Sequence, residues 1–186
     1  MPPGRSRSRL LRKGRLSIPG ARYFVTLCVE QRKAVLDRGK VMERLVEALR
    51  SLQREKDINL LCAVVMPDHL HVLFTLGKRL SLSQVWARFK VQTKEALLDW
   101  GAKWQENFHD HRIRDSESVD RFAYYSFLNP YVKGLLAVDE IWAGWLRNRE
   151  FRPAFLESVR EGELPHSEWI LKKDSIGHLI EIDMKG

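Results

Sequence analysis

The 186-residue sequence has only two cysteines and no long apolar run. Because a membrane-spanning helix needs about 18 or more consecutive apolar residues, we expect no transmembrane segment and no membrane partner. The first residues are basic, but no apolar segment follows them, so they do not resemble a secretory signal and we expect a cytoplasmic protein. Cys28 and Cys62 lie within apolar runs, which favours two buried free thiols over a disulfide or a metal site.

Acidic residues are absent from the first sixteen positions, where basic residues gather. The whole chain has a net charge of +8, which favours a polyanionic partner but does not distinguish DNA from RNA or membrane lipid. We interpret residues 1–19 as a basic N-terminal arm that is either simply solvated or in contact with phosphates. The candidate phosphate contacts in this arm are Arg5, Arg7, Arg9 and Arg12.

Apolar periodicity predicts one domain whose elements follow the order β-α-β-β-α-β-α. Strands are expected at 23–29, 60–66, 70–76 and 108–113, and helices at 41–56, 83–100 and from 116 or 118 to 136 with a kink at Pro130. This order is that of a ferredoxin-like split βαβ unit with an added C-terminal helix, an α+β fold with an antiparallel sheet. Helices would cover one face of the sheet and leave the other face free for a ligand. The domain is expected to span 20–145, and a C-terminal extension 146–186.

A His-x-His pair, His69 and His71, lies on the third predicted strand. Side chains two apart on a strand point to the same face, so two imidazoles at this spacing can bind one cation. A second pair, His109 and His111, has the same spacing on a less regular strand, and surface histidines without a role are the alternative for both pairs. The first pair is better placed, because it follows a tight turn on a long apolar strand.

Tyr124 and Tyr125 are adjacent on the last predicted helix. With about 100° of rotation per residue, the apolar residues of this helix form one stripe, and Tyr125 and Asn129 share a flank at i and i+4. A phenol can attack a phosphodiester when a divalent cation polarises the phosphate, and an amide oxygen can join two imidazoles as a ligand. A packing aromatic is the alternative for Tyr125. These residue types do not select between Mg²⁺ and Mn²⁺.

Two segments resemble a known family. VVMPDHLHVLF resembles the histidine–hydrophobic–histidine (HUH) motif of single-tyrosine transposases. KWQENFHDHRIRDSESVDRFAYYSFLNPYVKGLL is similar to the nucleophile segment of the REP-associated tyrosine transposases, and together with RYFVTL the resemblance spans residues 15–145. It implies a ferredoxin-like transposase domain and favours Tyr125 over Tyr124 as the nucleophile, because Tyr125 precedes the Asn of the Asn-Pro pair by four residues.

The resemblance also implies an activity, a metal and a DNA partner. The protein would be a transposase that cleaves and rejoins single-stranded, hairpin-associated DNA through a 5′-phosphotyrosine link to Tyr125, with a free 3′-hydroxyl. His69, His71 and Asn129 would hold a divalent Mg²⁺ or Mn²⁺ ion. Further candidates within the resembling region are Lys90 and Arg114 as DNA contacts and His111, whose role is unassigned.

The sequence departs from the family after the nucleophile helix, where DEIWAGWLRN replaces the usual Tyr/Trp-Ser-Ser segment and residues 146–186 match no motif. This departure concerns target preference more than chemistry. One alternative is a catalytically silent or domesticated DNA-binding regulator with the same fold, and another is a basic nucleic-acid-binding domain without a metal. The filled metal and nucleophile positions favour the enzyme. Both a monomer and a homodimer remain open.

Overall fold

The computed structural model describes residues 16–171. The predicted contacts Arg5, Arg7, Arg9 and Arg12 lie outside the described residues. The order β-α-β-β-α-β-α is confirmed, and a fifth strand and a short helix follow it. The strands are β1 (Arg22–Cys28), β2 (Ile58–Val65), β3 (His69–Leu76), β4 (His109–Arg112) and β5 (Trp145–Arg147). The helices are α1 (Gly39–Arg54), α2 (Leu82–Leu98), α3 (Val119–Val132) and α4 (Ser167–Leu171), with 3-10 turns η2 (Glu30–Arg32) and η3 (Ala154–Ser158).

The five strands form one antiparallel sheet in the order β4-β1-β3-β2-β5. The first four strands of this order have the ferredoxin-like arrangement that the sequence predicts. Strand β5 adds to the outer edge of β2 and crosses the expected boundary between residues 145 and 146. The central strands β1 and β3 pair so that Thr26 lies opposite His71 and Cys28 lies opposite His69.

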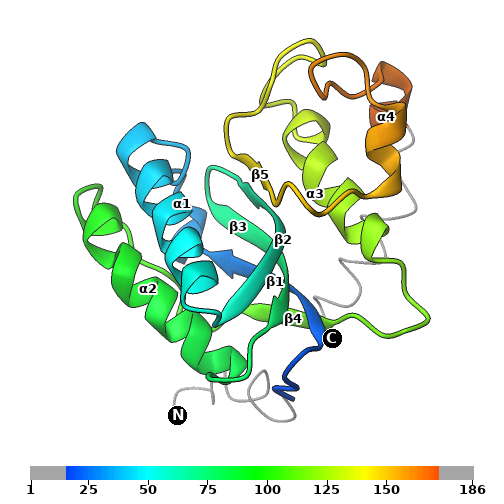
Figure 1. The fold of residues 1–186 in the computed structure, drawn as a ribbon. Coiled ribbons are helices and arrows are strands. Elements are labelled where there is room, and N and C mark those ends of the chain that lie inside the picture. The colour runs from blue at the N-terminus through cyan, green and yellow to red at the C-terminus, as the bar shows by residue number, and fades with distance from the viewer. Residues whose placement is uncertain (1–15, 172–186) are drawn as a thin grey trace, which may run out of the picture.

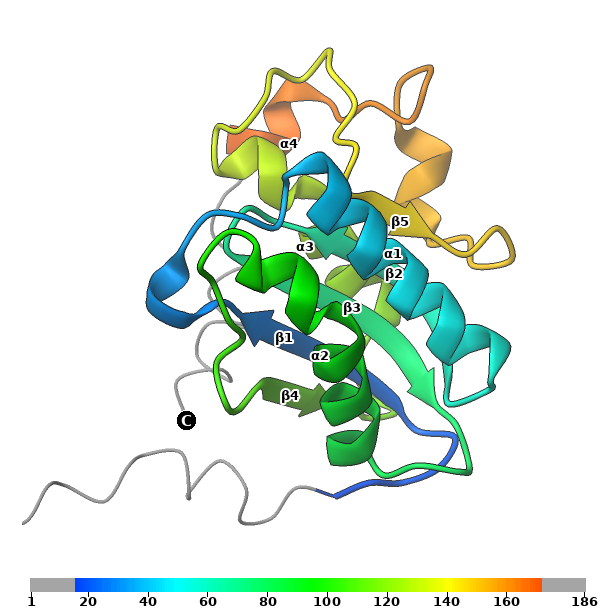
Figure 2. The same ribbon diagram turned by 90° about the vertical axis from the view of Figure 1, so that its left-hand side faces the viewer.

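Helices α1 and α2 cover one face of the sheet (Figures 1 and 2). The main core lies beneath them and takes Leu70, Val72 and Phe74 from β3. A second cluster on the opposite face joins Phe24, Cys62 and Leu73 to Phe122 and Ala123 of α3. The prediction that this face stays free is therefore wrong. Helix α3 and the segment after it are rich in aromatic side chains, which remove apolar area from water by packing on this face.

Helix α3 ends at Val132, four residues before the predicted end, and Pro130 lies in its last turn rather than its middle. The end is set by two backbone hydrogen bonds, from Gly134 N–H to Tyr131 O (2.9 Å) and from Leu135 N–H to Pro130 O (3.0 Å). This pattern is a Schellman motif, which requires a left-handed residue after the helix. Gly134 has φ 67° and fills that position without a steric penalty.

Two further expectations concern single residues. Cys28 and Cys62 are buried and free, which confirms the prediction of unpaired thiols. Burial raises the pKa of the Cys62 thiol far above its usual value, so this group stays protonated. Across residues 16–171, every helix is too short or too polar to cross a bilayer.

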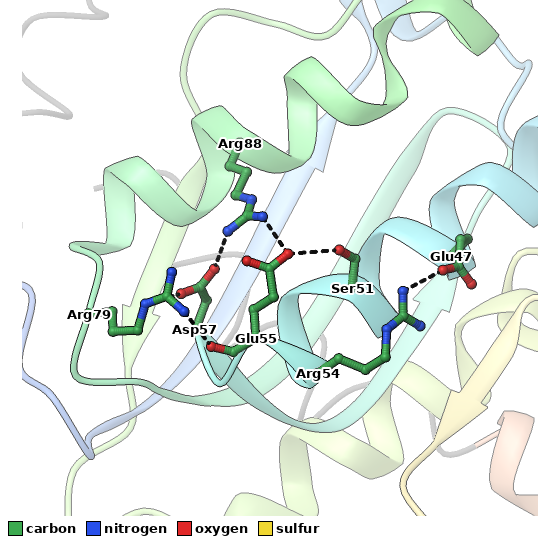
Figure 3. A network of polar contacts seen from close by, with 7 residues as sticks. All are labelled: Glu47, Ser51, Arg54, Glu55, Asp57, Arg79 and Arg88. Atoms are coloured by element: carbon green, nitrogen blue, oxygen red, sulfur yellow. Dashed lines mark hydrogen bonds and ion pairs between the residues drawn. The ribbon is translucent and has the colours of Figure 1, made fainter.

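A polar network ties α2 to the junction between α1 and β2 (Figure 3). The Asp57 side chain is fully buried, and Arg88 Nη1 donates to its Oδ2 atom over 2.8 Å. Arg88 also bonds Glu55, whereas Arg79 Nε is 3.7 Å from Asp57 Oδ1, too far for a hydrogen bond. Because both carboxylates belong to the α1–β2 junction and Arg88 belongs to α2, the network fixes the helix layer against the start of β2.

Candidate active site

His69 and His71 point from β3 to the face that carries α3, together with Leu73. Both imidazoles are buried, with exposed fractions of 8% and 1%. Their Nε2 atoms approach to 3.1 Å, and the ring planes are nearly perpendicular at 80°. The period-two placement predicted from the sequence therefore brings the two nitrogen atoms to one point.

The opposite nitrogen of each ring has its own partner. Asp68 Oδ1 is 2.6 Å from His69 Nδ1, and Thr26 Oγ1 is 2.7 Å from His71 Nδ1. A carboxylate only accepts, so the proton in this contact lies on His69 Nδ1, and Nε2 is the nitrogen that faces His71. Histidines that bind metals are oriented in this way by partners on the far nitrogen.

Thr26 allows His71 to adopt either neutral tautomer, because a hydroxyl both donates and accepts. When the Thr26 hydroxyl donates to Nδ1, His71 Nε2–H donates to His69 Nε2 and the 3.1 Å contact is an ordinary hydrogen bond. When His71 Nδ1–H donates to Thr26, both Nε2 lone pairs face the same point. Two lone pairs at this distance repel each other unless a cation lies near both of them.

Electrostatics keep His71 neutral and Asp68 charged. Burial lowers the pKa of His71 well below its usual value, and the nearby charges of His69, Arg32 and Lys133 lower it further. The hydrogen bond from His69 lowers the pKa of Asp68, with Arg32 also contributing. A histidine binds a metal only when its imidazole is neutral, and an ionised carboxylate such as Asp68 can accept the hydrogen bond that orients the ring.

Helix α3 brings Tyr125 to the histidines. The Tyr125 ring is half-buried and lies edge-on to His71, with 5.4 Å between ring centroids. Phe24 stacks on the His71 ring with 5.2 Å between centroids and also meets the Tyr125 ring edge-on at 6.1 Å. Asn129 lies one turn further along the same flank of α3, and its buried Oδ1 atom has no hydrogen-bond partner.

These residues fit a divalent cation. Ligand atoms about 2.1 Å from a cation and at right angles to each other lie about 3 Å apart, close to the observed separation of the two Nε2 atoms. A buried amide oxygen without a donor is costly unless something outside the protein satisfies it. Within residues 16–171, no three side chains of His, Cys, Asp or Glu gather to hold a metal, and a role for Asn129 as the third ligand stays a prediction.

Comparison with known proteins places the chain in a family. Residues 17–113, just over half of the chain, match the family described as "Transposase IS200 like". The chain belongs to the IS200-like transposase family. The REP-associated tyrosine transposase of Escherichia coli (strain K12) is 27% identical over 131 residues, which are 69% of this chain and 77% of that protein. The solved structure of a REP-associated tyrosine transposase bound to a REP hairpin has a TM-score of 0.61 at 25% identity, covering 70% of this chain and 79% of that one.

This transposase uses its other predicted site residues in different contacts. His111 pairs with Glu117 over 2.8 Å and stacks on Phe122, on the α3 face but at the edge strand β4. Lys90 Nζ donates to the carbonyls of residues 105, 106 and 107, so it holds the loop that leads into β4. Arg114 uses its backbone N–H to bind Glu117, and its side chain is exposed. A DNA contact for Lys90 or Arg114 stays a prediction.

Three residues around the transposase histidines were not found from the sequence. Asp68 lies directly before His69 in the sequence, and this adjacency was a usable signal. Thr26 is brought to His71 by pairing between strands that are far apart in the sequence. Arg32 reaches Asp68 Oδ2 over 3.4 Å from the turn after β1, and no sequence pattern marks it.

Proposed function

We propose that this IS200-like transposase cleaves and rejoins single-stranded, hairpin-associated DNA, with Tyr125 as the nucleophile. The observation that carries the proposal is the buried, unpartnered Asn129 Oδ1 on the flank of α3 that places Tyr125 against His71. One helix would thus supply both a nucleophile and a ligand oxygen to the histidine pair. If Asn129 served only to pack the fold, its buried side-chain oxygen would be expected to accept a hydrogen bond.

In the proposed reaction, Tyr125 Oη attacks the scissile phosphorus and the bond from phosphorus to the 3′ oxygen breaks. The phenolic proton passes to water, and the leaving 3′ oxygen takes up a proton to become a hydroxyl. The 5′ phosphate remains on the enzyme as a phosphotyrosine. A 3′-hydroxyl then attacks this link, releases Tyr125 and restores a phosphodiester, so the energy of the broken bond is conserved for rejoining.

His69, His71 and Asn129 would hold a divalent cation, either Mg²⁺ or Mn²⁺. When bound, such a cation polarises the phosphate and offsets the charge that develops on its oxygens. Asp68 and Thr26 would hold the two imidazoles in orientation from their far nitrogens. Phe24 would fix the His71 ring by stacking, and the buried position of this ring limits the access of water.

The hairpin substrate is supported by the structural relative, which was solved bound to a REP hairpin. Family membership supports DNA transposition as the biological reaction. The positive net charge of the chain agrees with a polyanionic partner. A catalytically silent regulator with the same fold would share these three features. Only a test of DNA cleavage distinguishes the two functions.

The test is formation of a covalent adduct. We would incubate the protein with a pool of labelled DNA hairpins carrying randomised single-stranded flanks, in Mn²⁺ or Mg²⁺, and look for a labelled protein band after denaturation. The wild type should form an adduct that disappears with chelator, and Tyr125→Phe should form none. Tyr124→Phe is the matched control, because Tyr124 packs against Phe155 and Trp169, away from the histidines.

Two results would contradict the enzyme. One is the absence of any adduct with the wild type over the whole pool. The other is an adduct that persists in Tyr125→Phe but is lost in Tyr124→Phe. Hairpin binding without an adduct, in either metal, would favour the silent DNA-binding regulator.

A further inference from the structure

Arg32 lies at the edge of the histidine pair. It belongs to turn η2, which follows β1 and is tied to the Asp68 backbone by a 2.9 Å hydrogen bond from Val29 N–H. One guanidinium nitrogen, Nη1, contacts both Cys28 Sγ at 3.2 Å and Asp68 Oδ2 at 3.4 Å. More than half of the side chain, 55%, is still exposed, so the guanidinium can accept a further partner from solvent.

The backbone at Arg32 adopts a conformation that is uncommon for a residue other than glycine. Gln31 and Arg32 both have positive φ, 55° and 56°, although neither is glycine. The turn is held from both sides, since Glu30 N–H donates to Lys103 O over 2.8 Å and Lys33 Nζ donates to Trp100 O over 2.6 Å. Non-glycine residues in this region persist where the surroundings impose them, and such positions concentrate at functional sites.

Lys133 lies at the end of α3, the helix that brings Tyr125 to His71. It is the C-cap residue of α3, one helical turn beyond Asn129, and its side chain is exposed. Among the described residues, Lys133 Nζ has no hydrogen-bond or ion-pair partner. Tyr125, about two helical turns earlier on the same helix, meets the His71 ring with 5.4 Å between ring centroids. Two exposed cations therefore belong to the two segments, η2 and α3, that border the histidine pair.

An anion bound near these two cations would stabilise the arrangement. Asp68 is the carboxylate that contacts the histidines, and it already faces both His69 and Arg32. A divalent cation on the histidine pair would add further positive charge beside Arg32 and Lys133. A phosphate group placed among these cations offsets the repulsion and gains charge-assisted hydrogen bonds.

We propose that Arg32 and Lys133 form a phosphate clamp, which binds the DNA backbone beside the histidine pair. The inference rests on the proposed function, and it assigns DNA contacts to two residues of the described chain. Arg32 contacts one phosphate through its planar fork, and Lys133 contacts another as a point charge. The clamp sets the position of the backbone relative to Tyr125.

The salt dependence of binding tests the clamp without any reaction. In the Tyr125→Phe protein, we would measure affinity for one hairpin of the pool, with its single-stranded flank, over a range of KCl concentrations. Each phosphate contact contributes a slope of about 0.7–0.9 in log affinity against log salt, so adding Arg32→Ala or Lys133→Ala should each lower the slope by about that amount. Arg50→Ala is the matched control and should leave the slope unchanged, because Arg50 is an exposed arginine of α1 on the opposite face of the sheet (Figure 1).

Replacing one DNA phosphate at a time with an uncharged analogue identifies the phosphates that Arg32 and Lys133 contact. Methylphosphonates placed one at a time along the flank should weaken binding to the Tyr125→Phe protein at two positions. Adding Arg32→Ala should abolish the sensitivity at one of them and Lys133→Ala at the other. Arg32→Lys, which keeps the charge, should retain most of the slope.

Mn²⁺ binding, measured without DNA, shows whether a substitution acts indirectly by disturbing the metal site. Lys133→Ala should bind Mn²⁺ as well as the parent protein or more tightly, because a repelling charge is removed. Weaker Mn²⁺ binding by Lys133→Ala would overturn the clamp, and so would unchanged salt slopes in both variants. Failure of the wild type to form an adduct contradicts the proposed function instead, so the two failures are distinguishable.

Discussion

Replacing Arg88 with alanine should destabilise the fold strongly, because the change leaves the buried Asp57 carboxylate without its hydrogen-bonded cation. The Asp57 side chain has no exposed area, and Arg88 Nη1 is 2.8 Å from it. Removing one partner of a buried pair costs about 3–5 kcal/mol. We expect the lower end, about 3 kcal/mol, because Arg79 remains 3.7 Å away and one third of the Arg88 side chain is exposed.

Thermal unfolding followed by circular dichroism measures the effect. For a chain of this length, 1 kcal/mol corresponds to about 2–4 °C in the unfolding midpoint, so Arg88→Ala should lower Tm by about 6–12 °C. Arg54→Ala is the matched control, because Arg54 makes a short 2.6 Å pair with Glu47 in which both side chains are largely exposed (Figure 3). Exposed pairs contribute little, so this variant should unfold close to the wild type.

A second substitution isolates the cause. In an Asp57→Asn background, the buried charge is gone, so adding Arg88→Ala should cost clearly less than it does in the wild type. The reasoning would be refuted if Arg88→Ala and Arg54→Ala lowered Tm equally. It would also be refuted if the cost of Arg88→Ala were the same with and without the Asp57 carboxylate.

Three further predictions concern the candidate site and α3. Thr26→Val removes the partner of His71 Nδ1 and should weaken Mn²⁺ binding by about 10–100-fold, measured by the spectroscopic signal of free Mn²⁺. Asn129→Leu replaces an unsatisfied buried amide with an apolar group, so Tm without metal should stay or rise, while the Tm increase on adding Mn²⁺ disappears. Gly134→Ala places a side chain at φ 67° and should destabilise by about 1–2 kcal/mol in urea unfolding; an unchanged midpoint would contradict the role given to the Schellman motif.

Local patterns predicted much of the fold. Alternation along β3 correctly placed His69 and His71 opposite the main core, because period-two geometry depends only on neighbouring residues. Helical rotation likewise put Tyr125 and Asn129 on one flank of α3. The order of the elements was sufficient for the ferredoxin-like sheet, since few topologies accommodate that order.

The features that were missed depend on contacts between distant segments. Thr26 meets His71 through the register of β1 and β3, which no local pattern encodes. The packing of α3 on the second face depends on aromatic surface contributed by the chain after it, including Trp145 and Phe155. The left-handed conformation of Arg32 could not be predicted either, because the turn contains no glycine to mark it.

The packing of α3 against the sheet of its own chain has a consequence for subunit cooperation. Tyr125 reaches His71 within one molecule, so the set of His69, His71, Tyr125 and Asn129 comes from a single polypeptide. Mixing Tyr125→Phe protein with His71→Ala protein should therefore not restore adduct formation, even if the two chains associate. Intermolecular complementation is expected only of sites divided between subunits, and the contact between Tyr125 and His71 within one chain argues against such a division.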